Sequence, residues 1–167
     1  HIYIADVATG RSRRIMTTPI LATFVTQPVW TSNGTQIATV LIPATRGPEP
    51  KAPAIAEGPK VRMTKEGVKH RTRTYAVLLE WPHGREVVEY YTTGQLATID
   101  VRSRAVRRIG APAMIQRVDP SPSGSFIRVT VMQKPFSHIL PVSSFGTVDL
   151  VWDTNGRSVA ELSRRAL

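Results

Sequence analysis

The stretch LATIDVRSRAVRRI (residues 96–109) decides the fold class, because it reads as an apolar strand, an Asp, a short polar turn and a returning strand. Two other stretches have the same pattern, IYIADVATGRSRRI (residues 2–15) and VDLVWDTNGRSVAEL (residues 148–162). The last of these carries Asn-Gly, a strong hairpin signal because both residues tolerate a positive φ. The sequence therefore predicts three equivalent antiparallel hairpins.

A second repeated element follows the first two hairpins. VWTSNGTQIATV (residues 29–40) matches VDPSPSGSFIRV (residues 118–129), since both have a strand entry, a turn with Ser and Gly, and a long apolar strand. The Asp of the second hairpin and that of the third are separated by about one propeller blade repeat, which is ~40–50 residues. The pattern predicts an all-β fold over residues 1–167: a partial β-propeller of about two to three blades, where a closed ring needs ~4–8. We therefore expect an excerpt of a longer propeller chain.

The wider interval between the first two hairpins predicts inserted material over residues 43–89. Residues 43–60 are rich in Pro, which cannot join a strand ladder, so we expect an extended surface loop. Residues 74–81 place Tyr75, Leu78 and Leu79 on one helical face, which predicts one short helix that Pro82 ends. Residues 86–91 are then expected to return to a strand.

Composition excludes several classes of site. The chain has 167 residues and no Cys, which excludes a disulfide scaffold, a Cys-ligated zinc site and a thiol nucleophile. No apolar run approaches the ~20 residues that span a bilayer, so we expect no membrane partner. The four His residues lack metal-site spacing and no phosphate-binding glycine loop is present, so we expect neither a metal nor a cofactor. Ser158 follows a hairpin turn and not the strand–turn–helix of a nucleophile elbow, which predicts an exposed strand serine.

The net charge of +10 has three interpretations. A solvated basic face is the one we favour, and a field that steers acidic peptides is the second. Nucleic-acid binding is the third, but it would need stacking aromatics. Aromatic residues are 7% of the chain, and those present are expected in the core of the strands. We therefore expect no nucleic-acid partner.

Three motifs carry a resemblance to a known family. They are RTYAVLLEWPH (residues 73–83), EYYTTGQL (residues 89–96) and KPFSHILPVSSF (residues 134–145). In this order, after a Pro-rich insertion, they resemble the N-terminal propeller of prolyl-oligopeptidase-family serine peptidases, in particular the glutamyl-endopeptidase-like branch of bacteria and plastids. The resemblance extends from Ile2 to about Trp152.

The resemblance implies a two-domain enzyme whose propeller screens peptide substrates by size before cleavage, with a preference for Glu. Its α/β-hydrolase domain, with a Ser-Asp-His triad, would be absent from this chain, so the segment alone is not expected to be catalytic. The family pattern implies a substrate-binding role for Lys134, Phe136 and Arg73, toward an acidic peptide. Lys134 stands where the pattern has Arg, and an ammonium lacks the bidentate fork of a guanidinium.

A second interpretation stays open at the level of sequence: a non-catalytic propeller, similar to TolB-like proteins, that serves as a protein-interaction module. A peptide substrate and the missing hydrolase domain are the partners expected under the first interpretation. The compartment is also open, between the periplasm or export and the cytoplasm of a bacterium.

Overall fold

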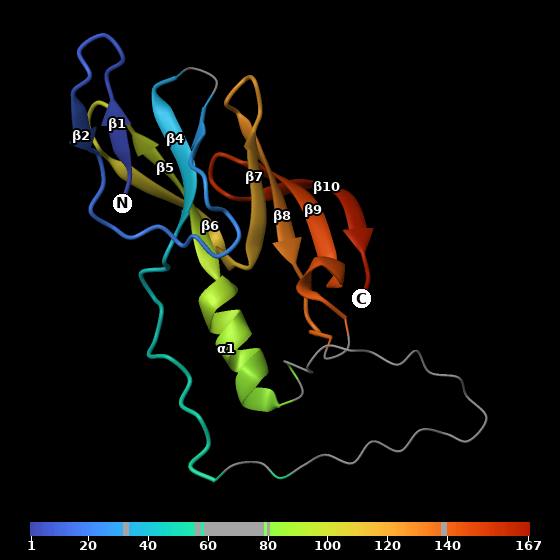
Figure 1. Cartoon of the computed structure of the whole chain (residues 1–167). Helices are drawn as coiled ribbons and strands as arrows, with labels where there is room; N and C mark the ends of the chain where they lie inside the picture. Colours follow the sequence, from blue (N-terminus) through green and yellow to red (C-terminus); the bar gives the residue numbers. More distant parts are fainter. Residues whose placement is uncertain (32–33, 56–57, 59–78, 80, 138–139) are drawn as a thin grey trace.

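The described residues form antiparallel sheets and one α-helix (Figure 1). The structure is a computed structural model, and it describes residues 1–31, 34–55, 58, 79, 81–137 and 140–167. The elements are β1 (Tyr3–Ala5), β2 (Ser12–Arg14), β3 (Val29–Trp30), β4 (Gln36–Leu41), α1 (Pro82–Thr92), β5 (Gly94–Asp100), β6 (Val106–Ala113), β7 (Ile115–Pro120), β8 (Phe126–Met132), a 3-10 helix η1 (Val142–Ser144), β9 (Thr147–Asp153) and β10 (Ser158–Arg165). The prediction of an all-β fold with one short helix is confirmed at this level.

The three predicted hairpins are β1–β2, β5–β6 and β9–β10. In each hairpin the first strand is followed or ended by an Asp, whose carboxylate accepts backbone N–H groups of the turn that begins there. These hydrogen bonds stabilise the charged carboxylate and lower the pKa of all three Asp side chains. The N–H donors lie 2.8 Å (Thr9 to Asp6), 2.7 Å (Ser103 to Asp100) and 2.9 Å (Arg157 to Asp153) from the accepting oxygens.

Two four-stranded sheets follow one another along the chain, β3-β4-β5-β6 and β7-β8-β9-β10, each pairing its strands in sequence order. Their facing sides share one apolar cluster, in which Leu96 and Ile109 of the first sheet meet Val129 and Trp152 of the second. The other side of the sheet β3–β6 packs against the hairpin β1–β2. The three units therefore lie in succession from β1 to β10, as Figure 1 shows.

The sheet β3–β6 is covered on both sides, so its central strands β4 and β5 are buried on both faces. Strand β4 is buried at every position from Ile37 to Leu41, which is typical of an inner strand covered on both faces. Strand β8 alternates instead, with Ile127 and Val129 buried and Arg128 exposed. That period of two is typical of a strand with one face turned away from the core.

Helix α1 lies in a segment for which the sequence predicted a strand. Most of residues 74–81 fall outside the described part of the chain, and α1 begins at Pro82, where the sequence had predicted a helix end. The strand predicted over residues 86–91 is wrong, since these residues are helical. Pro is well suited to the first helical turn, because its missing N–H would have no intrahelical partner there. Val88 packs against an apolar cluster, and this tertiary contact outweighs the strand propensity of its neighbours.

The described part of the Pro-rich insertion, residues 43–55 and 58, has neither helix nor strand, as predicted. In the part of the chain that the structure covers, no helix is long and apolar enough to cross a membrane.

Candidate functional site

The candidate site lies at the end of the sheets that carries α1 and the β8–β9 connection (Figure 1). An apolar cluster joins these segments beneath the surface. Its buried members are Leu79, Met114, Met132, Phe136 and Phe145, with Phe24 and Val88 packed against them. Residues far apart in the sequence thus form one local body, which fixes α1 against the second sheet.

Phe136 is part of this cluster and not of the surface. It is 7% exposed, and its ring stacks on that of Phe145 with centroids 5.7 Å apart. Phe145 is fully enclosed at 1% exposure. The pair holds the β8–β9 connection in place, so Phe136 positions the residues on either side of it.

Lys134 lies two residues before Phe136 and its ammonium group is at the surface. Its Nζ is 2.8 Å from Oε1 of Glu89 on α1, and the two side chains are 58% and 44% exposed. An ion pair this exposed contributes only ~0–1 kcal/mol to stability, because water screens it. Another carboxylate could therefore replace Glu89 at small cost. Arg73, the third residue implied by the family pattern, lies outside the described residues.

The last turn of α1 holds the start of the Pro-rich loop. The guanidinium of Arg46 stacks over the ring of Tyr90 at 4.9 Å and donates a hydrogen bond of 2.8 Å to the carbonyl of Thr93. A hydrogen bond with Glu49 raises the pKa of the neighbouring Tyr91. The start of the loop thus packs against α1, the helix that also carries Glu89, the partner of Lys134.

Sequence reasoning missed Arg46 and Glu89 as parts of this site. Glu89 is in the EYYTTGQL motif, which was a signal for the segment but not for its partner. Arg46 had no signal, because its contact with Tyr90 joins two segments that no local pattern connects.

Other chemistry is limited in the described part of the chain. There, no three His, Asp or Glu side chains come together in a way that could hold a metal ion. Ser158 is exposed at the start of β10, in a hairpin, as predicted for an ordinary strand serine. The geometry therefore offers a surface that can bind a charged or aromatic group.

Comparison with known proteins shows a distant similarity of the chain to proteins named as peptidases. No family model matches the sequence. A probable chloroplastic glutamyl endopeptidase of Oryza sativa subsp. japonica is 29% identical over 163 residues, and one of Arabidopsis thaliana is 30% identical over 163 residues. Each alignment covers 96% of this chain and 17% of the relative. The chain is thus similar, along nearly its whole length, to a minor part of proteins named glutamyl endopeptidases.

Proposed function

We propose that this chain is part of the β-propeller of a serine peptidase of the glutamyl-endopeptidase type, where it gates and positions peptide substrates. The observation that carries the proposal is the similarity over 96% of the chain to two proteins named glutamyl endopeptidases. Two consecutive four-stranded sheets that pack face to face support it, because propeller blades have this organisation.

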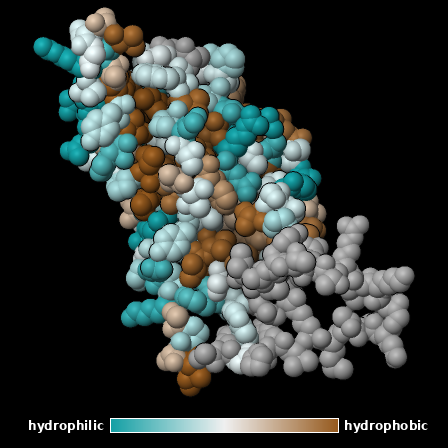
Figure 2. Space-filling model, in the orientation of Figure 1, coloured by the Kyte–Doolittle hydropathy of each residue, from teal (hydrophilic) through white to brown (hydrophobic). Residues whose placement is uncertain are grey.

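In this proposal the sheets β3–β6 and β7–β10 are two blades, and β1–β2 is the outer half of a preceding blade. A groove of about 340 Å³ beside β1 supports this assignment, since it is lined by Ile4, Trp30 and Ile37, among others. Figure 2 shows apolar residues at the surface on the side of the molecule that carries β1 and β4. The strands equivalent to β1 are β5 and β9. Each of them pairs with the strand that precedes its hairpin, β5 with β4 and β9 with β8. A preceding strand would fill the groove in the same way.

The remaining blades and the α/β-hydrolase domain with its catalytic triad would belong to the rest of the protein. Hydrolysis would proceed by acyl transfer from the peptide to the serine and then to water. This chain would supply no group to that chemistry, and its net charge of +10 would steer acidic peptides toward the ring.

Lys134 is our proposed contact for an acidic substrate side chain. Its ammonium group is exposed and already pairs with a carboxylate, that of Glu89, which a substrate would displace. Phe136 would act as a positioning residue that holds the segment of Lys134. Arg73 remains a prediction for a residue outside the described part of the chain.

A fluorophosphonate probe tests the enzyme class in the full-length protein. Covalent labelling of one serine, blocked by prior incubation with a peptide that ends in Glu, is the expected result. No labelling of the folded protein would contradict the peptidase proposal and favour the TolB-like interaction module.

Charge reversal tests Lys134 in the same full-length protein. Lys134→Glu is expected to lower kcat/KM for substrates cleaved after Glu by ~10-fold or more, because like charges at a recognition pair repel. The effect on matched Gln substrates should be much smaller. Lys51→Glu, the same charge change at another exposed residue, is the control. Equal rates for Lys134→Glu and the unaltered protein on Glu substrates would remove Lys134 from the site.

A further inference from the structure

The two four-stranded sheets can be compared position by position, because each aligns on the Asp of its hairpin. Val40 of β4 pairs with Leu96, four residues before Asp100. Thr130 of β8 pairs with Asp149, four residues before Asp153. Asp149 therefore occupies, in the sheet β7–β10, the place that Leu96 has in the sheet β3–β6.

This position is part of the apolar core in the other units. Leu96 pairs with Ile109 across β5 and β6, and both are at most 2% exposed against the following sheet. In the hairpin β1–β2 the corresponding pair is Ile2 and Ile15, buried against the sheet β3–β6. In the sheet β7–β10 the pair is Asp149 and Ser163. The pair that is apolar and buried in the other two units is thus polar in the sheet β7–β10, where it lies on the side that faces away from the sheet β3–β6.

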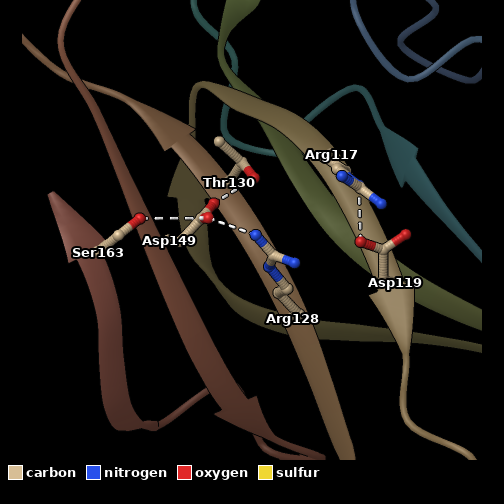
Figure 3. Close-up of polar contacts among 6 residues, drawn as sticks. All are labelled: Arg117, Asp119, Arg128, Thr130, Asp149 and Ser163. Carbon is tan, nitrogen blue, oxygen red and sulfur yellow. Dashed lines mark hydrogen bonds and ion pairs between the residues drawn. The ribbon is translucent and has the colours of Figure 1, made fainter. Parts of the chain in front are cut away.

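A polar network surrounds Asp149 on this face (Figure 3). Its Oδ1 accepts a hydrogen bond of 2.5 Å from Thr130, and its Oδ2 accepts one of 2.5 Å from Arg128 and one of 3.4 Å from Ser163. These contacts, the one from Thr130 first, lower the pKa of Asp149. On β7, Nε of Arg117 lies 2.7 Å from Oδ2 of Asp119.

The guanidinium groups on this face keep part of their donor capacity open to solvent. The side chains of Arg117 and Arg128 are 61% and 42% exposed, and a guanidinium carries five N–H donors. An apolar sheet laid on this face would bury such donors without acceptors, which costs free energy. A sheet with polar groups, or with bridging water between the two faces, would supply acceptors for these donors and avoid that cost.

The arginine contact between successive units changes at the same junction. Arg13 donates a hydrogen bond of 2.8 Å to the carbonyl of Val101 in the next hairpin, and Arg107 donates one of 2.6 Å to Oδ1 of Asn155 in the hairpin after that. Both Arg residues stand seven positions after the Asp of their own hairpin. The third hairpin has Ala160 at this position, which has no group to make such a contact.

We propose that the face of the sheet β7–β10 with Asp149 is a polar junction with a further β-sheet of the same protein, and that this junction opens more readily than the two apolar ones. The proposal rests on the proposed function, and on the continuity of this face with the two sheet junctions already described. The facing sheet would supply hydrogen-bond acceptors for Arg117 and Arg128. Where the two other junctions bury an apolar pair, this one would have charged contacts, which salt weakens.

Single thiols at equivalent positions test the proposal in the full-length protein, in a background without other reactive thiols. Val151→Cys and Thr98→Cys both lie two residues before the Asp of their hairpin, on the face directed to the next unit. The rate of maleimide labelling is measured at low and high NaCl and divided by the rate for the same variant in denaturant. We expect the thiol at position 151 to react roughly 10-fold or more faster than that at position 98, and to accelerate with salt, as a locally opening region does.

Two results would overturn the proposal, and they differ in what else they remove. Labelling at position 151 as slow as at position 98, with no response to salt, would refute the polar junction but keep the stacked sheets. Labelling as fast as in denaturant would mean that no sheet covers this face, and would refute the propeller assignment as well. If Val151→Cys does not fold, Ala160→Cys, its cross-strand neighbour, gives the same measurement.

Discussion

Replacing Gly156 by Ala tests how closely the two four-stranded sheets approach each other. Gly156 lies in the turn between β9 and β10 with φ +84°, where an L side chain is strained by ~1–2 kcal/mol. An added Cβ would come within less than 3.0 Å of the backbone N and Cα of Gly110 on β6. Because these are backbone atoms, they cannot swing aside, and the sheets must shift. Overpacking of this kind costs ~1–3 kcal/mol, so the total loss expected is ~2–5 kcal/mol.

Gly10→Ala is the matched control. Gly10 is in the equivalent turn between β1 and β2 with φ +67°, and an added Cβ would meet nothing within 4 Å. Only the backbone strain of ~1–2 kcal/mol should apply. Gly34→Ala, in the turn between β3 and β4 with φ +64° and the same open space, repeats the control within a four-stranded sheet.

Urea unfolding, followed by circular dichroism, measures the difference between these variants. With a slope of ~2 kcal/mol per molar urea, the extra ~1–3 kcal/mol should lower the midpoint of Gly156→Ala by ~0.5–1.5 M relative to Gly10→Ala. Equal midpoints for the Gly156 and Gly34 variants would refute the close backbone contact between the turn and β6.

Three further predictions concern the core, the ion pair and the Asp turns. Leu96→Ala should lower the free energy of unfolding by ~2–5 kcal/mol, because Leu96 is 0% exposed between the sheets. Val159→Ala, at a residue that is 50% exposed, should change it by ~0.5 kcal/mol or less. Equal losses of unfolding free energy for the two variants in urea titrations would contradict this. Glu89→Gln should free Lys134 and tighten binding of an acidic peptide by up to ~5-fold in calorimetry, a gain that a neutral peptide should not show. The pKa of Asp100 is lowered by folding, so near that pKa the folded state binds fewer protons than the unfolded one. The contribution of Asp100 to stability is therefore complete above the unfolded pKa of ~3.9 and is lost as pH falls toward the folded pKa. Asp100→Asn should therefore flatten the fall in midpoint below pH ~5, and an unchanged slope would exclude this Asp as a cause.

The hairpins and their repeat could be predicted from the sequence because their signals are local. The Asp, the turn residues and the alternation of apolar side chains all lie within about one hairpin, and they agree with one another. The all-β class, the buried strand β4 and the extended loop after it follow from the same kind of evidence.

Helix α1 could not be predicted over residues 86–91 for the opposite reason. Residues 86–91 include Val and Tyr, which favour strands, while α1 depends on the packing of Val88 against residues distant in the sequence. Likewise, Lys134 was found as a candidate from a motif, but its partner Glu89 lies in another motif and the two meet only in the folded chain.

Asp149 illustrates the boundary between the two kinds of information. In the sequence it is one polar residue in an apolar strand, which is ordinary for an antiparallel sheet with a solvated side. Only the register of β8, β9 and β10 shows that Asp149 occupies the position that the core residue Leu96 has in the other sheet. The same register places Arg128, Thr130 and Ser163 beside it. The sequence by itself thus determined where the chain turns and pairs, since those choices are made by neighbours. Which faces are apolar, and what each sheet can pack against, was decided by the tertiary structure, because burial depends on contacts between residues that are far apart along the chain.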